Sequence, residues 1–167
     1  NPFPVVVTTG ALPQSFHTLN NFDVNVHSGF AIQDEYLPVF GIRVEPGSGV
    51  TFNLINLNII TNGNTSATLG YRWHMNPTLS SAYSWSEIGT SGIQYVQFQD
   101  VAGTPNEITS NTVVHSSGVV GKSVSELTEE MKKFSFTDGG IEMFLEIKRL
   151  DSGSKQDFWY DMTMAKY

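Results

Sequence analysis

Short apolar stretches separated by turn residues recur along the whole chain. In "FDVNVHSGFAI", Phe22, Val24 and Val26 alternate with polar residues, which is the period of a half-buried β-strand. About ten such segments with frequent turns between them predict an all-β fold, an antiparallel β-sandwich of the jelly-roll-like type. The further segments are "YLPVFGIRV", "VTFNLINLNII", "ATLGYRWHM", "SAYSWSEI", "IQYVQFQ", "NTVVHSSGVV", "IEMFLEIKRL" and "QDFWYDMTMAKY".

One segment departs from this pattern. In "SVSELTEEMKKF" the apolar residues Leu127, Met131 and Phe134 fall at helical spacing, and acidic residues precede a lysine pair. The sequence therefore predicts one short helix near 124–134.

The chain has the length of a single domain, and no linker or internal repeat divides its 167 residues. Pro2 and Pro4 cannot donate to a β-ladder, so the start of the chain is expected at a sheet edge or on a neighbouring subunit. We therefore expect an N-terminal arm or edge strand over 1–20 and a single β-sandwich domain over 21–167.

The charge balance disfavours two classes of partner. The formal net charge is −7, so attraction to nucleic acid or to an anionic membrane is not expected. No apolar run approaches the roughly 20 residues that a membrane-spanning helix needs. The absence of cysteine excludes disulfides, thiolate catalysis and cysteine-based metal sites.

No catalytic or metal-binding motif emerges from the polar residues. The four histidines do not pair at metal-ligand spacing, so we expect no metal and no cofactor. Acidic residues leave open a glycan-active enzyme that uses a carboxylate pair, although a surface position is the simpler interpretation. The histidines are His17, His27, His74 and His115, and the acids considered are Asp34, Glu35, Glu87, Asp100 and Glu107.

Four aromatic residues allow two interpretations. Tyr71 and Trp73 alternate along one predicted strand, and Tyr83 and Trp85 alternate along the next. Such pairs on neighbouring strands are typical of cross-strand core contacts. Exposed and coplanar, Tyr83 and Trp85 would instead form a platform for a sugar ring, and they are the candidate binding residues.

The second half of the chain, roughly 35–167, resembles small β-structured proteins of tailed-phage virions. The likeness rests on Tyr71, the corner Asn76-Pro77-Thr78-Leu79, "SSAYSW" up to Trp85, "IGTSGIQYV" and "TVVHSSGVVG". It extends to "MFLEIKRLDSGSKQDFWYDMTM", with Arg149 and Trp159, and to Arg43 in an earlier strand pair.

This resemblance implies a non-enzymatic structural protein located on the virion, at the capsid or tail surface. Its expected role is capsid decoration or that of a head or tail accessory component. The implied partners are other virion proteins, such as a major capsid or tail protein, and further copies of the chain, a trimer being one such assembly. The alternative is the carbohydrate- or receptor-binding tip of a tail fibre, with a host surface glycan as ligand. The resemblance supplies no catalytic residues.

Overall fold

The computed structural model describes residues 12–20, 30–32, 35–61, 68–98, 106–120, 135–137, 140–152 and 155–167. These residues form eleven β-strands, and no helix occurs among them. The strands are β1 (Ser15–Asn20), β2 (Phe30–Ile32), β3 (Leu37–Val44), β4 (Thr51–Thr61), β5 (Thr68–Met75), β6 (Ser86–Glu87), β7 (Ile93–Gln97), β8 (Val113–Val120), β9 (Ser135–Thr137), β10 (Glu142–Arg149) and β11 (Lys155–Lys166).

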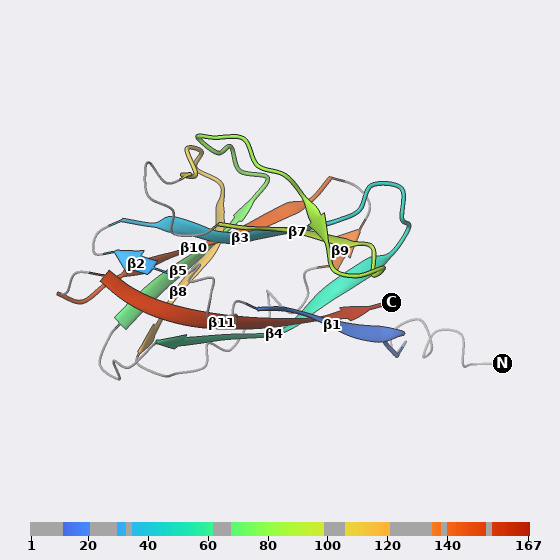
Figure 1. The fold of residues 1–167 in the computed structure, drawn as a ribbon, viewed down its shortest axis with the longest axis horizontal. Helices are drawn as coiled ribbons and strands as arrows, with labels where there is room; N and C mark the ends of the chain where they lie inside the picture. The colour runs from blue at the N-terminus through green and yellow to red at the C-terminus, as the bar shows by residue number, and fades with distance from the viewer. Residues whose placement is uncertain are drawn as a thin grey trace.

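The strands are arranged in two antiparallel sheets. Sheet 1 has the order β1-β11-β4-β9, and β2 pairs with the start of β11. Sheet 2 has the order β6-β7-β3-β10-β5-β8. In Figure 1, β3, β7 and β10 lie above β11, β4 and β1, so the two sheets form separate layers. Within sheet 2, β3 and β10 pair directly although they lie far apart in the sequence.

The hydrophobic core lies between these layers. The ring of Phe40 on β3 contacts Trp73 on β5, with centroids 5.6 Å apart, and Tyr160 on β11, with centroids 4.9 Å apart. All three side chains are fully buried, and Tyr160 comes from the opposite sheet. Burial of large aromatic side chains of this kind is a dominant source of stability in a domain of this size.

The sequence predicts much of this arrangement. The all-β prediction is confirmed for the described residues, and Tyr71 and Trp73 are buried core residues on β5, as expected. The strand predicted over "SAYSWSEI" is wrong except at Ser86–Glu87, because the residues before Ser86 form a loop instead. The predicted helix near 124–134 lies outside the described residues, as do residues 1–11. Ser15–Asn20 forms β1 at an end of sheet 1.

Candidate functional site

The candidate site lies on the outer face of sheet 2. The outer face of a two-layered β domain is usually exposed to solvent, but here other parts of the protein cover it. Along β10, Met143, Leu145 and Ile147 belong to the core between the sheets. The alternate residues Phe144 and Glu146 therefore point outward, yet they are only 0% and 2% exposed. A further layer of the chain must cover this face of β10.

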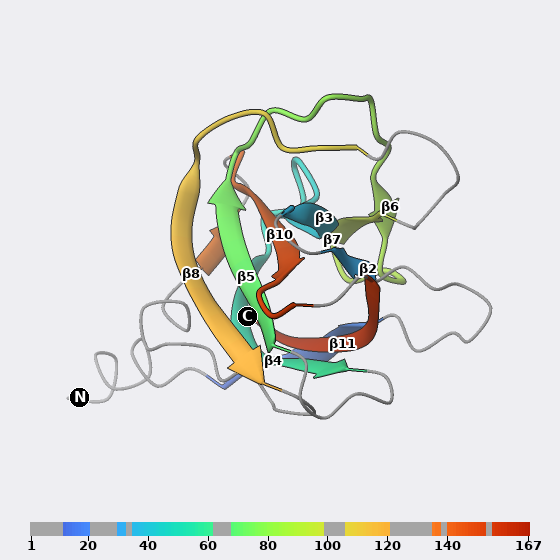
Figure 2. The ribbon, with the colours of Figure 1, turned by 90° about the vertical axis from the view of Figure 1, so that its left-hand side faces the viewer.

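That layer is made by two loop segments, 76–85 and 106–112, which we call the arch. They run side by side at the top of Figure 2, after β5 and before β8. Leu79 and Ile108 form an antiparallel bridge, and the Thr109 amide donates to the Thr78 carbonyl at 2.8 Å. The two segments therefore support each other although about 30 residues separate them in the sequence.

Polar side chains hold the arch in place. The Asn106 Oδ1 atom accepts from the Ser81 amide at 2.9 Å, and its Nδ2 group donates to the Ser81 carbonyl at 3.1 Å. At the corner, Asn76 adopts a positive φ of 50°, and its Oδ1 atom accepts from the Glu142 amide at 2.7 Å. Asparagine tolerates this left-handed conformation better than most residues. The corner is thereby fixed to the first residue of β10.

An aromatic cluster joins the arch to sheet 2: Tyr83 and Trp85 belong to the arch, Phe98 follows β7, and Phe144 lies on β10. The ring of Phe144 is at its centre, with centroids 5.5 Å from Tyr83, 5.8 Å from Trp85 and 6.1 Å from Phe98. Tyr83 and Trp85 meet edge to face at 77°, so the two candidate binding rings are not coplanar. Both are half-buried. Edge-to-face contacts of this kind are favourable and define the positions of the rings.

Charged groups border the cluster. The Arg43 guanidinium lies 4.5 Å from the centre of the Trp85 ring, donates to Gln94 Oε1 at 2.8 Å and pairs with Glu142 at 3.3 Å. The Tyr83 hydroxyl donates to the second oxygen of Glu142 at 3.4 Å. Burial, followed by the negative charge of Glu142, raises the pKa of Tyr83 above its ordinary value. Arg43 therefore covers part of the surface that Trp85 would offer to a sugar.

A buried ionic chain continues along the same face. Glu146 Oε1 accepts from Arg72 Nε at 2.7 Å and lies 2.6 Å from His74 Nε2. On the other side of the imidazole, Nδ1 lies 3.0 Å from the Thr112 hydroxyl. A carboxylate accepts hydrogen bonds and donates none, so Nε2 of His74 donates to Glu146. Because Thr112 belongs to the arch, these contacts connect the arch to His74 on β5 and Glu146 on β10.

The order carboxylate, imidazole, hydroxyl also occurs in nucleophilic enzymes, where the imidazole activates the hydroxyl. Here the same carboxylate oxygen also binds Arg72, and the hydroxyl of Thr112 lies 3.4 Å from that of Ser110. The arrangement therefore fits a structural tie between layers.

The other candidate residues are dispersed. His17 Nε2 lies 2.9 Å from the Ser15 hydroxyl, at hydrogen-bond distance, and the His17 ring packs against Phe52. His27 and the side chain of His115 lie outside the described residues. Among the described residues, no three His, Asp or Glu side chains are grouped to hold a metal ion, and no helix is long and apolar enough to cross a membrane.

The acidic candidates lie in different parts of the chain. Glu35 and Glu107 are exposed, while Asp34 and Asp100 lie outside the described residues. Glu87 is also exposed, and a hydrogen bond to it together with its charge raises the pKa of the neighbouring Glu45.

Sequence reasoning missed the buried ionic chain. Arg72, Glu146 and Thr112 were not candidates, because each lies within an unremarkable strand or loop pattern. One signal was present: in "EMFLEIKR" charged residues alternate with apolar ones, but Phe144 stands in the polar register. An aromatic residue at an outward position indicates that the outer face is covered.

No family model matches the chain, and neither a curated protein nor a solved structure matches it.

Proposed function

We propose that this chain is a non-enzymatic structural protein of a tailed-phage virion, a capsid decoration or a head or tail accessory component. It would lie on the capsid or tail surface and act through contacts with other virion proteins and with further copies of itself. The proposal starts from the resemblance of the Asn76-Pro77-Thr78-Leu79 corner and its neighbouring strands to such proteins. The observation that carries it is the strand order of the two sheets.

We interpret that order as a jelly roll with added strands. When the eight main strands of the two sheets are numbered along the chain, sheet 1 has the order 1-8-3-6, and sheet 2 has the order 2-7-4-5. Capsid domains of viruses use this architecture, as do some lectins. The eight main strands, numbered along the chain, are β1, β3, β4, β5, β8, β9, β10 and β11.

Two surface features support assembly. Among the described strands, β1 stands at an end of sheet 1, a position from which sheets of different subunits commonly associate. Phe16 on this strand is 62% exposed, and the preceding Leu12 is 86% exposed. Large exposed apolar side chains on a strand at the end of a sheet are suited to subunit contacts, including those of a homo-oligomer such as a trimer.

The second candidate function is the glycan-binding tip of a tail fibre. One observation favours it: half-buried Trp85 lies beside polar groups of Arg43, Gln94 and Glu142, which could bind sugar hydroxyls. The 77° angle between Tyr83 and Trp85 and the cover provided by Arg43 weaken it. Titration with neutral and acidic oligosaccharides, followed by tryptophan fluorescence in the parent chain and in Trp85→Phe, would detect such a site.

The primary proposal is tested by quantitative mass spectrometry of phage particles purified on a density gradient. Peptides of this chain should copurify with the major capsid protein at a fixed ratio through successive gradients. Loss of the chain from the particles, with recovery only in the soluble fraction of the infected cells, would overturn the proposal.

A further inference from the structure

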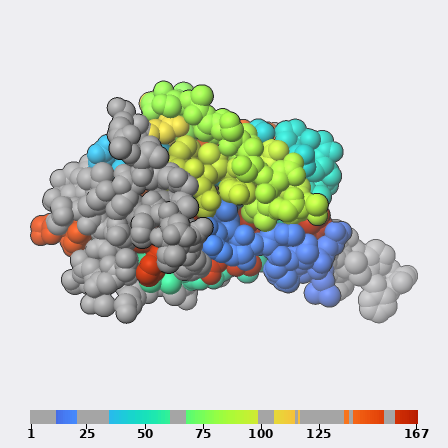
Figure 3. Space-filling view, in the orientation of Figure 1, coloured from blue at the N-terminus to red at the C-terminus, as the bar shows by residue number. Residues whose placement is uncertain are grey.

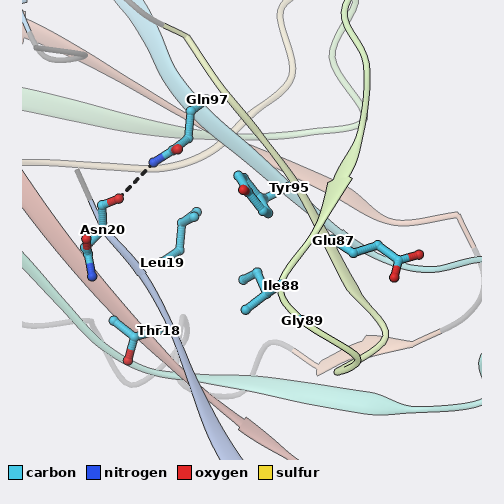
Figure 4. A pocket seen from close by; sticks show the side chains of 8 residues that line it. All are labelled: Thr18, Leu19, Asn20, Glu87, Ile88, Gly89, Tyr95 and Gln97. Atoms are coloured by element: carbon cyan, nitrogen blue, oxygen red, sulfur yellow. Dashed lines mark hydrogen bonds between the residues drawn. The ribbon is translucent and has the colours of Figure 1, made fainter. Parts of the chain in front are cut away.

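A groove lies between the two sheets, where β1 of sheet 1 faces the hairpin formed by β6 and β7 of sheet 2. Figure 3 shows β1 in blue directly below the yellow-green hairpin. The groove is lined by residues 18–20, 87–89, 95 and 97 (Figure 4). It encloses about 320 Å³, which lies near the lower end of the range for small-molecule sites. We call it the edge groove.

Part of the lining is apolar. Figure 4 shows the side chains of Leu19, Ile88 and Tyr95 pointing toward one another. Leu19 belongs to the hydrophobic core, and Ile88 and Tyr95 are half-buried and pack against that core. A small-molecule site typically combines an apolar, partly aromatic lining with a few polar groups at defined positions.

A fixed amide supplies the first of these polar groups. The Gln97 Nε2 group on β7 donates to the Asn20 carbonyl on β1 at 2.9 Å (Figure 4), and it also donates to the Tyr160 hydroxyl on β11. A carbonyl oxygen only accepts hydrogen bonds, so these contacts orient the amide and leave its Oε1 atom as an acceptor. Among the described residues, no group donates to Oε1. The acceptor is thus positioned before a ligand binds, which lowers the cost of binding.

The Tyr95 hydroxyl supplies the second polar group. Burial raises the pKa of Tyr160 above its ordinary value, and the charge of an ionised Tyr95 would raise it further, so the two tyrosines influence each other. No described residue forms a hydrogen bond with the Tyr95 hydroxyl, which can both donate and accept. The edge groove therefore combines an apolar surface with groups that suit the hydroxyls of a sugar.

The charge around the edge groove favours a neutral ligand. No lysine or arginine lines the groove, and Glu87 is its one charged lining residue. Glu45 lies close to Glu87, because a hydrogen bond to Glu87 and its charge raise the pKa of Glu45. An acidic sugar or a phosphate would be repelled by these carboxylates and by the net charge of −7. In Figure 4 the Glu87 carboxylate points away from the other lining side chains, so a cation in the groove would gain no direct partner.

We propose that the edge groove binds a neutral saccharide, with one sugar ring against Tyr95 and sugar hydroxyls bonded to Gln97 Oε1 and to the Tyr95 hydroxyl. This inference rests on glycan binding, the second candidate function, and assigns it to the edge groove instead of to Trp85, which Arg43 partly covers. A strand added to β1 is a poorer occupant, because the Asn20 carbonyl is already bonded to Gln97.

The test is a titration of the full chain, labelled with ¹⁵N, with five neutral oligosaccharides: lactose, maltotriose, mannotriose, rhamnobiose and chitotriose. At least one of them should shift the backbone amides of Leu19, Ile88, Gly89 and Tyr95 and the side-chain amide of Gln97, with a Kd of about 1–10 mM. Trigalacturonic acid, in which every ring carries a carboxylate, is the acidic control and should bind at least several-fold more weakly.

Two matched variants separate the edge groove from the arch. Tyr95→Phe removes one hydroxyl from the groove and should weaken binding about threefold to tenfold, as expected for the loss of one hydrogen bond. Tyr83→Phe removes the hydroxyl of another half-buried tyrosine, outside the groove lining, and should leave the affinity unchanged.

The proposal is overturned if none of the five sugars shifts the groove amides at about 20 mM, or if trigalacturonic acid binds as well as the neutral sugar. It is also overturned if Tyr95→Phe and Tyr83→Phe weaken binding equally. Shifts confined to the amides around Trp85 would overturn the groove assignment but keep glycan binding, whereas the absence of all shifts would overturn both. None of these results affects the presence of the chain in purified particles, so the virion proposal is tested separately.

Discussion

Gly41 on β3 lies directly under the ring of Phe144 on β10. The two residues are register partners, and a Cβ atom added at Gly41 would lie 2.5–2.8 Å from three ring carbons of Phe144. The ring is the centre of the aromatic cluster and is held on its other sides by Tyr83, Trp85 and Phe98. The absence of a side chain at Gly41 therefore leaves the space that the Phe144 ring occupies.

Gly41→Ala should consequently destabilise the protein by about 1–3 kcal/mol, the usual effect of overpacking a filled site. Chemical denaturation of the parent and the variant measures the change in the free energy of unfolding. Repeating the substitution in a Phe144→Leu background should recover much of the loss, because the ring is then absent. A loss within about 0.5 kcal/mol in the parent background would contradict the tight contact.

The two glutamates of β10 that pair with arginines should differ strongly in their importance. Glu146 is buried and serves both Arg72 and His74, so Glu146→Gln should lower the free energy of unfolding by about 2–4 kcal/mol. Glu142 pairs with Arg43 while about a quarter exposed, so Glu142→Gln should lower it by less than about 1 kcal/mol. Equal losses of unfolding free energy in urea titrations would mean that the buried contacts of Glu146 stabilise the fold no more than the pair of Glu142 with Arg43.

Acid stability should depend on Asp151. Arg149 donates to both of its oxygens, at 2.7 and 3.0 Å, and this pairing lowers the pKa of Asp151 from 3.8 to about 2. A depressed pKa in the folded state adds stability above the ordinary pKa, and that stability is lost as the pH falls through the folded value. The difference in unfolding free energy between the parent chain and Asp151→Asn should be constant above about pH 5 and should shrink between about pH 4 and pH 2.

The measurement is the urea midpoint of both proteins across this pH range. A difference that stays the same from pH 7 to about pH 2 would show that the ion pair does not contribute.

Deletion of residues 1–10 should weaken assembly more than it weakens the fold. The deletion ends before Ser15, so the pairing of β1 with β11 remains intact. Light scattering should show a smaller particle, while the thermal midpoint should change by less than about 2 °C. An unchanged oligomer size would refute an assembly role for this segment. A large fall in the thermal midpoint would show that the segment contributes to the stability of the fold.

Alternation of apolar and polar residues correctly predicts strands whose apolar residues all point into the core between the two sheets. Tyr71 and Trp73 are examples, because their period of two is the period of the strand that carries them. Tyr83 and Trp85 show the same period but lie outside any strand, since Asn106 holds the adjoining Ser81 from 25 residues away. The period of an isolated segment cannot reveal a partner so distant in the sequence.

The candidate site was accessible to sequence reasoning only in part. Tyr83 and Trp85 were identified from their aromatic character. Glu146, Arg72 and Thr112 come together only because β10 and β5 are neighbours in sheet 2 and the arch returns over them. Those neighbours follow from the strand order, which alternation alone does not determine.

Cryo-electron microscopy of the purified particle tests the virion role most directly. We predict density for the two-layered β domain at a fixed position on the capsid or tail, in repeated copies that contact one another or a neighbouring virion protein. A particle map that accounts for every protein density without this fold would contradict that role.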